Sequence, residues 1–274
     1  MKIIHTFTNT LKIYCLTILL SASLLCLFST NPALAQNTSA NDTVRLYNVH
    51  DYIIVTVDPD NWYLTLINKN YRVALDYKPP KVEVLNGTGV KSDSRVAPHF
   101  NKMYDAAKAD GVTLIARSSY QPITSRIRLF SERVQKRMEE EGLTEYEAVY
   151  KTAQSLGYPG GSEHNLGFAV DFSITEDIKQ PVSGSFMRTD QYKWLVVHAA
   201  DYGFILRLPP DKLEITGVIH EPWHWRYVGV EVAKEIMARG ITLEEYLGRP
   251  YLSPEEAQKL KEQGVSIEEY LQKQ

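Results

Sequence analysis

One string in the sequence could hold a catalytic metal ion: His220-Glu221-Pro222-Trp223-His224. In the form H-E-x-x-H on a helix, two histidines on one face bind zinc and the glutamate is the general base of a metalloprotease. Pro222 argues against such a helix, because an internal proline removes a hydrogen bond and clashes with the preceding turn. The aromatic and β-branched flanks favour a strand. We therefore predict that His220 is not a ligand.

A second stretch, residues 160–173, places His164 and Asp171 seven positions apart with Gly167 between them. A loop with a central glycine can turn back, so that a histidine nitrogen and a carboxylate converge. Two histidines and one carboxylate, with a fourth position open, form a catalytic zinc set. The third ligand would be His224. A surface His and Asp at this spacing remain an alternative, because the spacing alone is not specific.

Such a site needs a further carboxylate that accepts a proton from water and passes it to a leaving amine. Glu221 suits this role, but it lies three residues from His224. In a regular strand these two side chains would point to opposite faces. We therefore expect a bulge or turn near Pro222, where a proline is tolerated.

The elements that must position these residues alternate along the chain. Strands are expected at 51–57, 62–70, 112–116 and 168–174, from their β-branched and aromatic content. Helices are expected at 99–111, 124–142, 145–156, 190–203 and 231–240. Capping boxes are expected at Thr144/Glu147, Thr242/Glu245, Ser253/Glu256 and Ser266/Glu269. The fold class is α+β: a small, mainly antiparallel sheet flanked by helices and carrying the zinc site.

The N-terminal residues differ from the rest. Two lysines precede an apolar run of about 16 residues, and Ala33-Leu34-Ala35 follows in A-x-A form, which predicts a signal peptide cut after Ala35 and a secreted protein. An uncleaved membrane anchor is the alternative, although the run is short for a span. Both cysteines lie within this segment, so the mature protein would have no disulfide.

The overall composition is that of an ordinary globular protein. The chain has 274 residues, 44% hydrophobic and 23% charged, with a formal net charge of −3. That charge gives no reason to expect a nucleic-acid partner. We divide the chain into a signal peptide (1–35), a leader and strand (36–61), a catalytic domain (62–250) and a C-terminal helical extension (251–274). No protein partner is implied, and a monomer is expected.

Two motifs resemble the VanY-type metallo-D-alanyl-D-alanine carboxypeptidases, which trim peptidoglycan stem peptides. Their pattern S-x-H-x-x-G-x-A-x-D is similar to Ser162 through Asp171, and their E-x-W-H followed by R-Y-V-G is similar to Glu221 through Gly229. The resemblance covers roughly 62–250. It implies one zinc ion held by His164, Asp171 and His224, with Glu221 as catalytic base and Ser162 close to the substrate.

The chain departs from that family at one place. Where the family has S-x-Y-R-S, with a glutamine five residues after the arginine, this sequence has Tyr120, then Gln121, and Arg126 at the glutamine position. Glutamine lacks the charged fork that binds a carboxylate in bidentate fashion. We therefore expect Arg126 to supply it. The alternative is that Arg126 is a solvated helix arginine, and Arg128 and Arg117 are weaker candidates for the same task. The candidate substrate-binding residues are Ser162, Tyr120, Gln121, Arg126 and Trp223.

The function expected is a secreted zinc carboxypeptidase that removes the C-terminal D-alanine from stem peptides. Alternatives are an L,D-carboxypeptidase acting on the same peptides, and a non-catalytic zinc-stabilised module that binds the cell wall. Glu221 argues against the last, because purely structural zinc sites fill all four positions with protein ligands. A zincin-type endopeptidase that uses His220 is disfavoured by Pro222.

Overall fold

The computed structural model describes residues 52–177, 179–249, 252–266 and 270. The expected signal peptide and most of the 36–61 segment lie outside these residues, as does most of the Ser266/Glu269 capping box. Within the described part, no helix is long and apolar enough to span a membrane. The expected boundaries at 61/62 and 250/251 stay predictions.

The centre of the fold is a four-stranded sheet in the order β5-β6-β8-β7, in which every neighbouring pair is antiparallel. Its strands are β5 (Ala116–Ser118), β6 (Ala169–Phe172), β7 (Phe204–Leu206) and β8 (His224–Tyr227). Two smaller pairs lie outside it. One joins β1 (Ile53–Ile54) to β2 (Tyr71–Arg72) in parallel, and the other joins β3 (Val82–Val84) to β4 (Lys91–Asp93) in antiparallel fashion.

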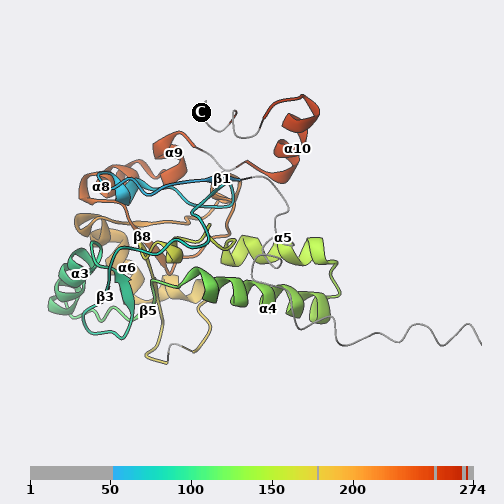
Figure 1. Cartoon of the computed structure of the whole chain (residues 1–274). Coiled ribbons are helices and arrows are strands. Elements are labelled where there is room, and N and C mark those ends of the chain that lie inside the picture. The colour runs from blue at the N-terminus through green and yellow to red at the C-terminus, as the bar shows by residue number, and fades with distance from the viewer. Residues whose placement is uncertain (1–51, 178, 250–251, 267–269, 271–274) are drawn as a thin grey trace, which may run out of the picture. The chain divides into compact units, whose positions relative to one another are not determined.

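Helices surround this sheet in the α+β arrangement that the sequence predicts (Figure 1). The α-helices are α3 (Ala97–Ala109), α4 (Ile123–Glu141), α5 (Glu145–Leu156), α6 (Asp190–His198), α7 (Leu213–Thr216), α8 (Val230–Arg239), α9 (Leu243–Leu247) and α10 (Pro254–Glu262). Short 3-10 turns are η2 (Trp62–Leu64), η3 (Glu163–Asn165), η4 (Gly184–Arg188) and η5 (Ala199–Tyr202). In Figure 1, α4 and α5 run side by side as a green pair.

Local sequence signals fix several helix ends. Thr144 accepts a hydrogen bond from the backbone of Glu147 while Glu147 reaches back to Thr144, so the expected capping box starts α5. Equivalent boxes start α9 at Thr242 and α10 at Ser253. These boxes satisfy backbone N–H groups that the first helical turn leaves without partners.

The main core lies between the sheet and α3. Phe100, Met103 and Ala107 share one face of α3, as their spacing predicts, and all are buried with Phe172 of β6. The α4–α5 pair has a separate apolar cluster that includes Phe130 and Val149. The catalytic candidates therefore stand on a sheet held rigid by packed apolar side chains on one side.

Two strand predictions are wrong in part. Residues 62–70 form no strand; the segment begins with η2, and the carbonyl oxygens of Tyr63 and Thr65 accept hydrogen bonds from the Arg226 guanidinium. A side chain takes the place of a neighbouring strand here, so the β-favouring pattern is overridden. The 112–116 strand is shifted to Ala116–Ser118, because β5 pairs with β6 only there and through an irregular register.

Candidate metal centre

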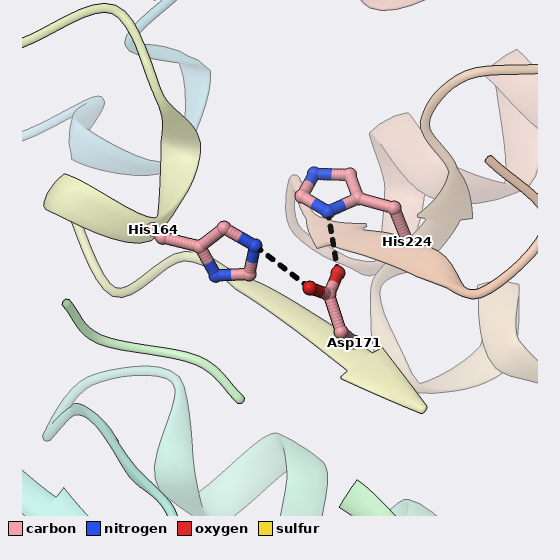
Figure 2. Close-up of side chains that lie close together, drawn as sticks. All are labelled: His164, Asp171 and His224. Atoms are coloured by element: carbon pink, nitrogen blue, oxygen red, sulfur yellow. Dashed lines mark hydrogen bonds and ion pairs between the residues drawn. The ribbon is translucent and has the colours of Figure 1, made fainter. Parts of the chain in front are cut away.

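Two of the three expected ligands are brought together by the sheet itself. Asp171 of β6 and His224 of β8 are directly opposed in the antiparallel ladder. Residues opposed in this way project from the same face with their Cβ atoms close together. The two side chains therefore meet, as Figure 2 shows.

The third ligand is delivered by the turn before β6. His164 lies in η3, and the chain then reverses through Gly167, whose φ is +73°. A Cβ atom at Gly167 would lie 2.7 Å from the Asp93 backbone nitrogen, so only glycine fits this turn. The expectation that a central glycine lets the loop fold back is confirmed.

The three side chains converge closely. His164 Nε2 lies 3.0 Å from Asp171 Oδ2, and His224 Nδ1 lies 2.7 Å from Asp171 Oδ1. Within the described residues, these three form a group whose possible ligand atoms all lie within 4.8 Å of one another. The two imidazole rings flank the Asp171 carboxylate from different sides (Figure 2).

In each histidine, the ring nitrogen that points away from Asp171 makes a hydrogen bond that fixes the tautomer. His164 Nδ1 donates to the Ser119 carbonyl at 2.7 Å, and His224 Nε2 donates to the Glu163 carboxylate at 3.1 Å. Metal-bound histidines almost always donate their second N–H in this way, which fixes the tautomer and orients the ring. The inner nitrogens, His164 Nε2 and His224 Nδ1, are left to face the cluster.

These inner nitrogens and Asp171 are suited to a cation. Burial lowers the pKa of His224, but hydrogen bonds to Asp171 and Glu163 outweigh it and raise the pKa to about 10. The cluster thus favours a positive charge between its members, which a proton or a metal ion can supply. Two imidazole nitrogens and one carboxylate are a ligand set that zinc accepts in catalytic sites.

Glu163 is a further candidate site residue, which contacts His224 and which the sequence spacing does not reveal. It is buried, and its pKa is held well below the ordinary value because Arg207 and Arg226 outweigh the effect of burial. The two arginines are 44 and 63 residues away in the chain, which is why no local pattern identifies the group. The only feature of the sequence that could have identified Glu163 is its position directly before His164.

Glu221 stands at the entrance to β8. The His224 backbone N–H donates to the Glu221 carbonyl at 3.1 Å, so residues 221–224 form the turn that Pro222 leads us to expect. The turn allows both Glu221 and His224 to line one cavity. Burial raises the pKa of Glu221 to about 8, although nearby His224 and Arg126 oppose the rise. Such a carboxyl group can accept and release a proton near neutral pH.

His220 lies outside the cluster. Its Nδ1 donates to the Leu208 carbonyl at 2.6 Å. The strand that carries His224 begins at that residue, so His220 and His224 do not share a helix face. The helical H-E-x-x-H arrangement is absent from this part of the described chain.

The cavity next to the cluster has a volume of about 560 Å³, within the range of small-ligand sites. Of the expected substrate-binding residues, four line it: Gln121, Arg126, Ser162 and Trp223. Tyr120 instead lines a neighbouring hollow beside the β3–β4 pair. The structure thus brings most of the candidates to the cavity beside His164, Asp171 and His224, and leaves Tyr120 at its margin.

A family model described as VanY, D-alanyl-D-alanine carboxypeptidase, matches residues 89–230. The chain belongs to the VanY family. The match contains the three clustered residues and Glu221, and it ends before α9 begins. The resemblance that the sequence motifs indicate is therefore confirmed.

Individual VanY relatives extend this comparison. A D-alanyl-D-alanine carboxypeptidase of Enterococcus faecalis is 37% identical over 190 residues, which cover 69% of this chain and 67% of that protein. A mutant of the vancomycin resistance D,D-pentapeptidase VanY, solved in complex with Zn(II), is 38% identical with a TM-score of 0.58, over 68% of this chain and 99% of that one. The LdcB LD-carboxypeptidase is 29% identical with a TM-score of 0.61, over 75% and 96%.

Proposed function

We propose that this VanY-family chain is a zinc-dependent carboxypeptidase that removes the C-terminal D-alanine from peptidoglycan stem peptides. The observation that carries the proposal is the convergence of His164, Asp171 and His224 beside Glu221 in one cavity. The Zn(II) complex of a related D,D-pentapeptidase and the name of the E. faecalis relative support the metal and the substrate.

Zinc at this position would polarise the scissile carbonyl and lower the pKa of a water molecule. The chain's own residues would transfer the proton and orient the metal ligands. Glu221 accepts the proton of the attacking water at its carboxylate and then delivers it to the nitrogen of the departing D-alanine. Glu163 and the Ser119 carbonyl hold the two histidine rings in their orientation.

A carboxypeptidase must also recognise a free terminal carboxylate, and Arg126 is suited to that task. It is only 4% exposed, lines the cavity, and donates through Nη2 to Ser162 Oγ at 2.5 Å. Its buried Nε has no hydrogen-bond partner among the described residues. Burial lowers the pKa of Arg126 to about 10, so the guanidinium remains charged at neutral pH. Gln121 beside it adds an amide but no charge.

We expect Arg126→Ala and Arg126→Lys both to lose activity on a peptide with a free C-terminus, because lysine keeps the charge but not the fork. The measurement compares kcat/KM on the free acid and on its C-terminal amide. The wild type should strongly prefer the acid, and both variants should lose this preference. Arg128→Ala, on the exposed side of the same helix, is the matched control. A preference that survives in Arg126→Ala would assign carboxylate recognition to another group.

Defined muropeptides test which peptide bond of the stem the protein cleaves. We expect the zinc-loaded protein to convert pentapeptide stems into tetrapeptide stems, read as the mass loss of one alanine. The likeness to LdcB makes L,D cleavage the second candidate, in which tetrapeptide stems would be shortened to tripeptides. Cleavage of tetrapeptides alone would replace the D,D assignment, and no cleavage of either would overturn the proposed function.

We further propose that the protein acts outside the cytoplasm, where peptidoglycan is found. We propose that it acts there as a monomer. The lysines, short apolar run and Ala33-Leu34-Ala35 at the start of the sequence support export. Protein recovered from the culture medium or cell wall should begin at Gln36. An N-terminus that still carries the apolar run would indicate the uncleaved anchor.

A further inference from the structure

A buried chain of charges connects the metal cluster to a helix outside the VanY match. Glu163 Oε2 accepts from His224 Nε2, and its Oε1 accepts from Arg207 Nε at 2.7 Å. The other end of the Arg207 guanidinium binds Glu244 of α9 in bidentate fashion, at 2.6 and 2.8 Å. The path from the histidine to α9 therefore has two intermediate side chains.

Every member of this path is removed from solvent. Glu163 is 6% exposed, Arg207 3% and Glu244 0%. Hydrogen bonds between charged groups in such surroundings are strong and influence one another, because little water screens them. Glu244 is also held by the Asn68 side-chain amide at 3.2 Å, so its carboxylate has little freedom to move.

The charges of the path are balanced. A second arginine, Arg226, donates to Glu163 Oε1 at 2.7 Å, so two carboxylates face two guanidinium groups. If Glu244 loses its charge, Arg207 is left with Glu163 as its only carboxylate partner in the path. Arg207 then draws more strongly on Glu163, which becomes a weaker acceptor for the His224 N–H. A weaker acceptor makes the opposite ring nitrogen a poorer metal ligand.

We infer that Glu244 is a positioning residue of the metal centre, acting on His224 through Arg207 and Glu163. The inference rests on the proposed zinc function, since it concerns how tightly the site holds that metal. It adds α9, which the family match does not include, to the parts of the chain that determine metal affinity. The alternative is that Glu244 serves only to fasten α9 to the domain.

The test measures the dissociation constant for zinc by competition with a chromophoric chelator, using metal-stripped full-length protein. We expect Glu244→Gln to weaken zinc binding about 10-fold, the lower end of the effect of changing a ligand's hydrogen-bond partner. Glu163→Gln, one step closer to the metal, should weaken it more. In the Glu163→Gln background, Glu244→Gln should cause no further loss, because its route to His224 is already cut.

Glu245→Gln is the matched control. Glu245 follows Glu244 in α9, but its carboxylate closes the capping box with Thr242 and pairs with Lys212 instead of Arg207. Its loss should lower the melting temperature of the metal-free protein without changing zinc affinity. If Glu244→Gln does not fold, Glu244→Asp keeps the charge on a shorter side chain and should show a smaller loss of affinity.

Unchanged zinc affinity in a folded Glu244 variant would overturn the inference and leave Glu244 as a structural contact. A further loss in the Glu163→Gln background would also overturn it, because the effect would then not pass through Glu163. Failure of the wild type to bind zinc at all would instead overturn the proposed function.

Discussion

Glu221→Gln is expected to bind zinc as the wild type does and to lose about 10²–10⁴-fold in kcat, the usual contribution of a general base. The amide retains the shape of the side chain at the turn before β8 but cannot accept a proton. Glu221 is not one of the three clustered residues, so the metal ligands remain complete. The loss should therefore appear in turnover and not in metal content.

The measurement pairs metal analysis with steady-state kinetics on a pentapeptide stem. Glu214→Gln, an exposed change in the nearby α7, is the control and should behave like the wild type. If Glu221→Gln hydrolyses the substrate at close to the wild-type rate, Glu221 has no part in proton transfer. If it loses zinc, the residue contributes to the metal site instead.

His164→Ala and His224→Ala should each abolish stoichiometric zinc binding and, with it, activity. Only three protein ligands converge in the described cluster, so removing one leaves two, too few for tight binding. The two variants should differ in stability. Each change removes one imidazole from Asp171. Beyond that, His164→Ala frees only the Ser119 carbonyl, whereas His224→Ala also removes a donor from the buried Glu163 carboxylate and should unfold at a lower temperature.

His220→Ala is the control for both histidines. It should keep about one zinc per chain, because His220 donates to the Leu208 carbonyl and lies outside the cluster. Zinc content measured on purified protein, with circular dichroism to establish folding, decides the result. Full stoichiometry in both ligand variants would mean that the site is misassigned, and metal loss on the His220 change would restore the helical interpretation of the motif.

Local rules of the sequence predicted much of the frame that holds this site. The Thr144/Glu147 box, the apolar face of α3 and the strand at His224 each depend on residues within a few positions of one another. The turn at Pro222 followed from geometry, since a strand could not place Glu221 and His224 on one face. Interactions of this range can be read from one sequence because the chain itself brings the partners together.

Interactions across long stretches of chain were not predictable in the same way. Residues 62–70 have a strand-like composition, yet the carbonyl groups of Tyr63 and Thr65 are bound by Arg226, more than 160 residues later. Arg126 was predicted to recognise the terminal carboxylate, but its hydrogen bond to Ser162, 36 residues away, was not predictable. Glu163 owes its role to arginines that folding brings to it, and no spacing pattern encodes such a meeting.

The direct opposition of Asp171 and His224 has a consequence for how the sheet assembles. Side chains alternate between faces along a strand, so a slip of β8 by one residue against β6 would send His224 to the opposite face from Asp171. A misaligned chain cannot offer the metal both groups. Zinc therefore stabilises only the correctly aligned sheet, by mass action, and the amount of metal retained by a refolded sample reports the fraction of molecules whose strands are in register.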